Sequence, residues 1–114
     1  MSRDESYLLD ILLIARDAKD FTRNMEKGAF LADRKSQYAV VRCLEVIGEA
    51  AKRLSEDAHQ RYPDIPWSAM ARMRDLLIHS YDKVDVNEVW DTVQRDIPVL
   101  ISALERIVPP EQET

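Results

Sequence analysis

The residues best suited to chemistry lie within eight positions, from Arg74 to Tyr81, in the order Arg-Asp-Leu-Leu-Ile-His-Ser-Tyr. Arg74 keeps its charge at any physiological pH and can bind two phosphate oxygens at once. His79 can accept or donate a proton near pH 7. A fixed cation beside a proton-transfer group is a minimal set for cleaving a phosphodiester bond without a metal. The pattern therefore indicates phosphoryl chemistry, with the rest of the chain as its scaffold.

The charge of the chain limits the size of any nucleic-acid site. The net charge is −5, which argues against a large nucleic-acid partner. Residues 84–114 carry two basic and seven acidic side chains, whereas residues 61–83 hold four basic against three acidic ones. A small cleft that handles one phosphate is compatible with this distribution, but a long basic groove is not. We therefore expect no DNA partner.

Composition predicts one domain over residues 1–114. With 46% hydrophobic and 32% charged residues, the chain has the balance of a globular protein and is long enough to bury a core. The single Cys43 excludes an internal disulfide and fits a reducing compartment. There is no signal-peptide pattern and no apolar run long enough to span a bilayer. We expect a cytoplasmic protein without a membrane partner.

Apolar residues recur every three or four positions in four segments, which predicts amphipathic helices. The first should cover about residues 4–27 and end at Gly28 in a left-handed cap. The second should start after the N-cap Asp33 and reach about residue 54, with helicity fading over residues 55–62. The third should begin at Pro66 and lose its pattern after Ser80.

The fourth helix should start at the N-cap Asp85 and reach Val108, with a kink at Pro98. Four amphipathic helices joined by short links, without any strand pattern, predict an all-α, antiparallel four-helix bundle. Gly48 lies inside the second helix, where glycine costs roughly 1 kcal/mol against alanine. A close helix crossing would offset that cost, so we expect two backbones to approach each other there.

The spacing of Arg74 and His79 leaves their joint action open. Five positions correspond to about 140° around an ideal helix, so the two side chains do not share one face. Both could reach one phosphate if His79 lies at a helix end or bend, or if Arg74 curls around the helix. The alternative is a surface arginine paired with Asp75 or Asp82 and a histidine that binds a backbone carbonyl. Two histidines and one cysteine are too few for a zinc cluster, and no metal or other cofactor is expected.

Four blocks of sequence, in their order and spacing, make the chain resemble the HepT-like family of the HEPN superfamily. This family consists of small all-helical toxins paired with minimal nucleotidyltransferase antitoxins, and the resemblance covers most of the chain. The blocks are residues 47–54 (IGEAAKRL), 65–67 (IPW), Arg74 with His79 and Tyr81, and 84–90 from Val-Asp to Val-Trp. One position departs from the family pattern, because Asp75 stands where asparagine is frequent.

The resemblance implies a metal-independent ribonuclease toxin of a type VII-like toxin–antitoxin system. It implies that Arg74 and His79 are catalytic, in a cleft at the two-fold interface of a homodimer with RNA as substrate. His79 would serve as general base or acid for attack by the adjacent 2′-hydroxyl, and Arg74 would stabilise charge on the phosphoryl oxygens. Asp75 would orient one of them. An MntA-like antitoxin would neutralise the toxin by AMPylation of Tyr81, which places bulk and negative charge at the cleft.

A second function remains compatible with the sequence. The chain could be a non-catalytic module that holds a nucleotide or substrate for a minimal nucleotidyltransferase. The small positive excess near Arg74 and the acidic total charge fit such a role. Cleavage of RNA would separate the two functions.

Overall fold

The computed structural model describes residues 2–79 and 84–108, and over these residues every regular element is a helix. The all-α prediction is thus confirmed. The elements are α1 (Arg3–Phe21), α2 (Lys27–Leu31), α3 (Arg34–Arg53), α4 (Glu56–Arg61), α5 (Trp67–His79), α6 (Val86–Asp91), the π-helical turn η2 (Thr92–Asp96) and α7 (Ile97–Ile107).

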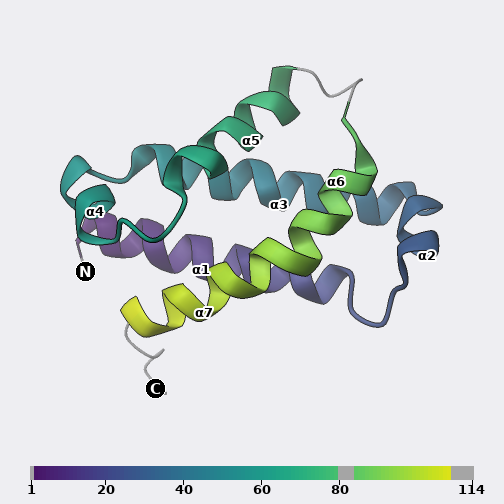
Figure 1. Cartoon of the computed structure of the whole chain (residues 1–114), viewed down its shortest axis with the longest axis horizontal. Helices are drawn as coiled ribbons and strands as arrows, with labels where there is room; N and C mark the ends of the chain where they lie inside the picture. Colours follow the sequence, from purple (N-terminus) through teal and green to yellow (C-terminus); the bar gives the residue numbers. More distant parts are fainter. Residues whose placement is uncertain (1, 80–83, 109–114) are drawn as a thin grey trace.

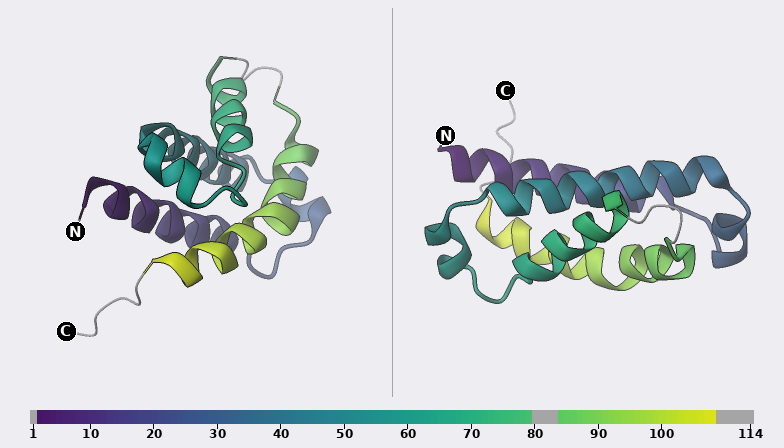
Figure 2. Two further views of the ribbon diagram at one scale, coloured as in Figure 1. Left: turned by 60° about the vertical axis from the view of Figure 1, so that its left-hand side comes forward. Right: turned by 90° about the horizontal axis from the view of Figure 1, so that it is seen from above.

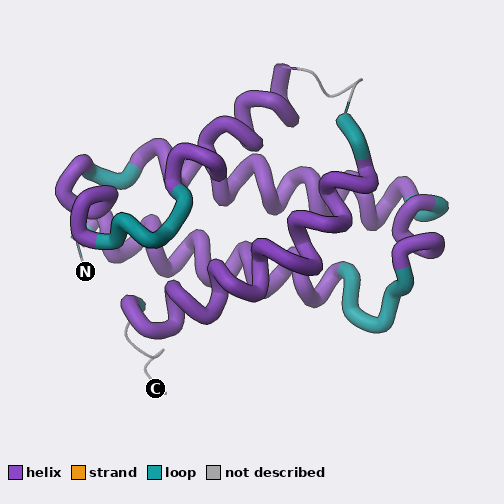
Figure 3. Tube along the Cα trace, in the orientation of Figure 1, coloured by secondary structure: helices purple, strands orange, loops and turns teal. Residues whose placement is uncertain are grey.

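The long helices form two layers (Figures 1 and 2). Helices α1 and α3 lie side by side and antiparallel in one layer, while α5 and the continuous α6–η2–α7 segment form the other. Helix α5 packs across α3, and α7 packs along α1. The connections that the structure describes in full are short (Figure 3), as the antiparallel bundle prediction requires.

The first helix is shorter than predicted. Ser2 and Glu5 form a capping box at its start, and it ends at Phe21 rather than near residue 27. Asn24, with φ at 64°, is the residue that adopts the left-handed conformation, which asparagine tolerates better than most residues. Gly28 instead lies inside α2. The prediction of a Gly28 cap is therefore wrong, because a turn before Gly28 already reverses the chain.

Helix α3 begins as predicted, because the Asp33 side chain accepts a hydrogen bond from the Ser36 backbone N–H at 3.4 Å. The expected loss of helicity over residues 55–62 is wrong. Ser55 caps a further short helix, α4, by accepting from the Ala58 N–H at 3.1 Å. The apolar periodicity of this segment is weak because only Ala58 of α4 is buried.

The second half of the chain follows the predicted boundaries. Asp85 caps α6 by accepting from the Asn87 N–H at 2.9 Å. Near Pro98, where a kink was predicted, the structure has the π-helical turn η2, which ends two residues before the proline. Proline has no N–H to donate to the carbonyl four residues earlier, and its ring crowds that carbonyl. The wider π-helical turn accommodates both effects.

One cluster of apolar side chains joins the two layers. Its largest fully buried members come from α1, α2, α3, α5, α6, η2 and α7: Ile11, Phe30, Val40, Leu77, Val89, Val93 and Leu104. Because α5 contributes Leu77 to this core, the helix that carries Arg74 and His79 is fixed in orientation. None of the described helices is both long and apolar enough to cross a membrane.

Candidate active site

The predicted close crossing at Gly48 is confirmed, and it carries Arg74. A Cβ added to Gly48 would lie 2.2 Å from Cβ of Arg74 and 2.7 Å from the carbonyl oxygen of Met70. Helix α5 therefore rests directly on the backbone of α3 at this point. The aliphatic stem of Arg74 fills the space that any larger residue at position 48 would occupy.

Two carboxylates from different helices hold the guanidinium of Arg74. Nη2 lies 2.8 Å from Oε2 of Glu49 on α3, and Nη1 donates to Oδ1 of Asp75 at 3.0 Å. The side chain is 22% exposed. Its Nε is buried and has no hydrogen-bond partner among the described residues. The head group is thus oriented by its surroundings, although part of it still reaches solvent.

Asp75 contacts Arg74. This contact is needed for one of the roles predicted for Asp75, the orientation of Arg74. Its Oδ1 also accepts from Nζ of Lys52 at 3.3 Å. The hydrogen bond from Arg74, followed by that from Lys52, lowers the pKa of Asp75 below its ordinary value. The residue is therefore a carboxylate at neutral pH. Two cations offset its charge, which reduces the repulsion that it would exert on a phosphate.

Glu49 binds two arginines at once, and sequence reasoning did not assign it a role. Its Oε1 accepts from Nε of Arg53 at 3.0 Å, while Oε2 faces Arg74. The hydrogen bond from Arg53 is the largest cause of a lowered pKa of Glu49, with the charge of Arg74 adding to it. The i, i+4 pair with Arg53 is visible in the sequence. The contact with Arg74 is not, because it depends on the crossing of α3 and α5.

His79 is the last residue of α5, and a helix end was one of the positions from which it could share a phosphate with Arg74. It is exposed, and its ring makes no hydrogen bond with any residue that the structure describes. The other histidine differs in this respect, because the ring of His59 lies 2.9 Å from the carbonyl oxygen of Ala51 and stacks on Trp67. Within the part of the chain that the structure describes, His79 is thus the histidine whose ring has no hydrogen-bond partner.

A groove of about 570 Å³ lies between α1, α3 and α5, and Arg74 lines it. Its charged residues are Asp10, Arg42, Glu45, Glu49, Arg53 and Arg74. Ile78 lines the groove but the neighbouring His79 does not. Within one chain, the structure does not bring the two predicted catalytic side chains into this groove together.

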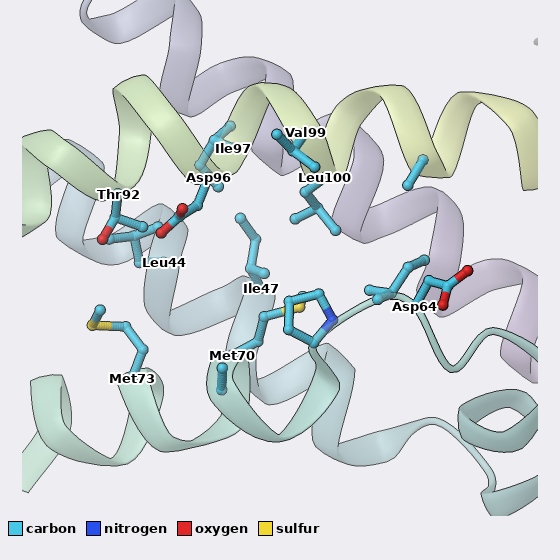
Figure 4. Close-up of a pocket in the computed structure, with 14 residues that line it drawn as sticks. Leu44, Ile47, Asp64, Met70, Met73, Thr92, Asp96, Ile97, Val99 and Leu100 are labelled. Atoms are coloured by element: carbon cyan, nitrogen blue, oxygen red, sulfur yellow. The ribbon is translucent and has the colours of Figure 1, made fainter.

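A second cavity, of about 270 Å³, separates α5 from α7 (Figure 4). Side chains such as Ile47, Met70, Met73 and Leu100 make it mainly apolar. Its charged residues are Asp64 and Asp96, which would repel a phosphate. This cavity is therefore a poor candidate for phosphodiester chemistry.

Tyr81, the predicted modification site, lies outside the described residues, and so does Asp82. Among the described residues, no three histidine, cysteine or acidic side chains converge in a group that could hold a metal ion. The groups available to the candidate site are therefore those of Arg74, Asp75, Glu49 and His79.

Comparison with known proteins places these residues in a family. The profile of the family "Ribonuclease HepT-like" matches residues 11–107, a stretch that contains all of α3 and α5. The chain belongs to the HepT-like ribonuclease family. The resemblance seen in the sequence is thereby confirmed.

Several HepT-like relatives match nearly the whole chain. "Probable ribonuclease HepT" of Thermococcus cleftensis is 47% identical over 103 residues, which is 90% of this chain and 94% of that protein. "Putative RNase MJ1216" of Methanocaldococcus jannaschii is 45% identical over 104 residues, 91% of this chain and 86% of the relative. No solved structure matches the chain.

Proposed function

We propose that this protein is a ribonuclease that cleaves RNA without a metal ion, with Arg74 and His79 as its catalytic residues. The observation that carries the proposal is membership of the HepT-like ribonuclease family over residues 11–107, which include both side chains. The geometry supports distinct roles for them. Arg74 is an oriented cation at a close helix crossing, and His79 is an exposed imidazole at the end of the same helix, without a hydrogen bond to the described residues.

In the proposed mechanism His79 takes the proton of the 2′-hydroxyl, which attacks the adjacent phosphorus. A P–O bond to the 2′-oxygen forms while the bond to the 5′-oxygen of the next nucleotide breaks. A proton then reaches that leaving oxygen, from His79 or from water. The guanidinium of Arg74 stabilises the negative charge that builds on the non-bridging oxygens.

The arrangement of α5 supports a homodimer as the active form. Leu76 and Ile78 are 53% and 38% exposed, and they lie between Arg74 and His79 in the sequence. Exposed large apolar side chains of this kind favour burial against a partner. A two-fold contact at this end of α5 would bring two Arg74–His79 sets to one interface, where the residues that a single chain leaves apart would face one RNA strand.

We further propose that a minimal, MntA-like nucleotidyltransferase antitoxin neutralises the toxin by AMPylation of Tyr81. Tyr81 follows His79 by two residues, so an added adenylate would place negative charge close to the imidazole and repel a phosphate. Incubation with such an enzyme and ATP should add the mass of AMP to the parent chain but not to Tyr81→Phe. Equal modification of both chains would contradict the assignment.

The test of the proposed function is RNA cleavage by purified protein in excess EDTA. The parent should cut RNA, and His79→Ala should lose activity by on the order of a hundredfold to ten-thousandfold, as expected for loss of a general acid–base group. His59→Ala is the matched control, because His59 faces Ala51 and Trp67, and it should retain activity. Tight nucleotide binding without cleavage of any RNA would instead identify a non-catalytic module.

A further inference from the structure

Glu49 connects Arg74 to a second cation across the α3–α5 crossing. It follows Gly48 directly, so it projects from α3 where the two backbones are closest. Each of its oxygens meets a different arginine: Oε2 lies 2.8 Å from Nη2 of Arg74, and Oε1 lies 3.0 Å from Nε of Arg53. One carboxylate therefore fixes two guanidinium groups at the rim of the α1–α3–α5 groove.

The donor inventory of Arg74 shows what this contact leaves free. A guanidinium has five N–H groups. The Nε–H is buried, Nη1 donates one N–H to Asp75, and Nη2 forms an ion pair with Glu49 at 2.8 Å. At least one N–H then remains on each terminal nitrogen. Two such donors on adjacent nitrogens are what a phosphate requires for a bidentate contact.

The two carboxylates restrain Arg74 differently. Asp75 is the next residue on α5, so it moves together with the arginine. Glu49 belongs to α3, so it links the guanidinium to the other helix of the crossing. Without Glu49, the Arg74 side chain would be free to rotate away from α3. Its remaining N–H groups would then point in another direction, even if Asp75, on the same helix, still accepted from Nη1.

We propose that Glu49 is a positioning residue of the active site, which orients the Arg74 guanidinium so that an N–H on each of its two terminal nitrogens faces the scissile phosphate. The catalytic consequence of this inference rests on the proposed function. The restraint on Arg74 does not. Ion pairs at this exposure, 22% for Arg74 and 37% for Glu49, contribute little to stability. The contribution of Glu49 is therefore to orientation.

Glu49→Gln should lower kcat for RNA cleavage by on the order of tenfold to a hundredfold, because small displacements of a catalytic group are costly. KM should stay the same or fall, since the variant removes a negative charge near the phosphate. The matched control is Glu45→Gln. Glu45 lies one turn earlier on α3, lines the same groove and pairs with Arg42, not with Arg74. An unchanged or higher kcat for folded Glu49→Gln would overturn the proposal.

A second readout does not depend on cleavage. In the parent, NMR of the arginine side chains should show slowed rotation of the Arg74 guanidinium and a protected Nε–H. The slowed rotation should be lost in Glu49→Gln and retained in Glu45→Gln, whereas the Nε–H, which the helix crossing buries, should stay protected in all three chains. Arg74 signals that stay as ordered in Glu49→Gln as in the parent would refute the positioning role, even if the parent cut no RNA. A parent without activity but with this loss of order would instead refute only the proposed function.

Discussion

Replacing Arg74 with alanine should reduce RNA cleavage by on the order of a hundredfold to a thousandfold, the range for removal of one preorganised group that stabilises the transition state. Arg74→Lys should recover little of this loss, because lysine is a point charge without the paired donors that a phosphate binds. Initial rates on a defined RNA, with parent and variants at equal concentration, measure the effect.

The Arg74→Ala chain should remain folded, which makes its activity interpretable. Glu49 keeps its bond to Arg53 and Asp75 keeps its bond to Lys52, so no carboxylate is left without a cation. Arg16→Ala is the matched control, because Arg16 is an exposed arginine of α1 that pairs with Glu105 at 2.9 Å. Equal losses of activity in the two variants would mean that net charge, and not the position of Arg74, controls cleavage.

Replacing Gly48 with alanine should destabilise the protein and also impair the site. The new methyl group would collide with Cβ of Arg74 and with a backbone carbonyl, neither of which is the mobile end of a side chain. Overpacking of this kind costs about 1–3 kcal/mol, and the better helix propensity of alanine returns about 1 kcal/mol at most. Because the 2.2 Å approach places this clash at the upper end of that range, we expect a net loss of about 2 kcal/mol in the free energy of unfolding, measured by urea denaturation.

The other glycine supplies the control for this prediction. A Cβ at Gly28 would meet nothing within 4 Å, and its φ is not positive. Gly28→Ala should therefore leave stability unchanged or raise it by up to about 1 kcal/mol. At a temperature where both variants are folded, only Gly48→Ala should lose RNase activity, since only there must α5 move away from α3. Equal stability of the two variants would contradict the close crossing.

The site could be predicted from the sequence only where local rules determine it. A glycine inside an amphipathic helix indicates a close approach, and the end of a periodic pattern indicates a helix terminus, so Gly48 and His79 were placed correctly. Asp75 is adjacent to Arg74, and their pairing was foreseen as an alternative. The contact between Glu49 and Arg74 was missed because it depends on the register of two helices, which only three-dimensional packing determines.

The fold class and the long helices were predictable from the sequence. The segments that connect the long helices were less predictable. The caps at Asp33 and Asp85 are carried by single polar residues at fixed offsets, so their positions were correct. The predicted cap at Gly28 failed because Asn24 supplies the turn first. Helix α4 was missed because its single turn and a half buries too few apolar residues to produce a periodic pattern.

The most direct measurement of the central claim is a crystal structure of the protein with an RNA whose scissile 2′-hydroxyl is replaced by hydrogen. We predict two copies related by a two-fold axis at α5, with an Arg74 guanidinium and a His79 imidazole each within about 3 Å of oxygens around one phosphorus atom. The account would be contradicted if the two side chains contacted different phosphates, or if neither contacted a phosphate.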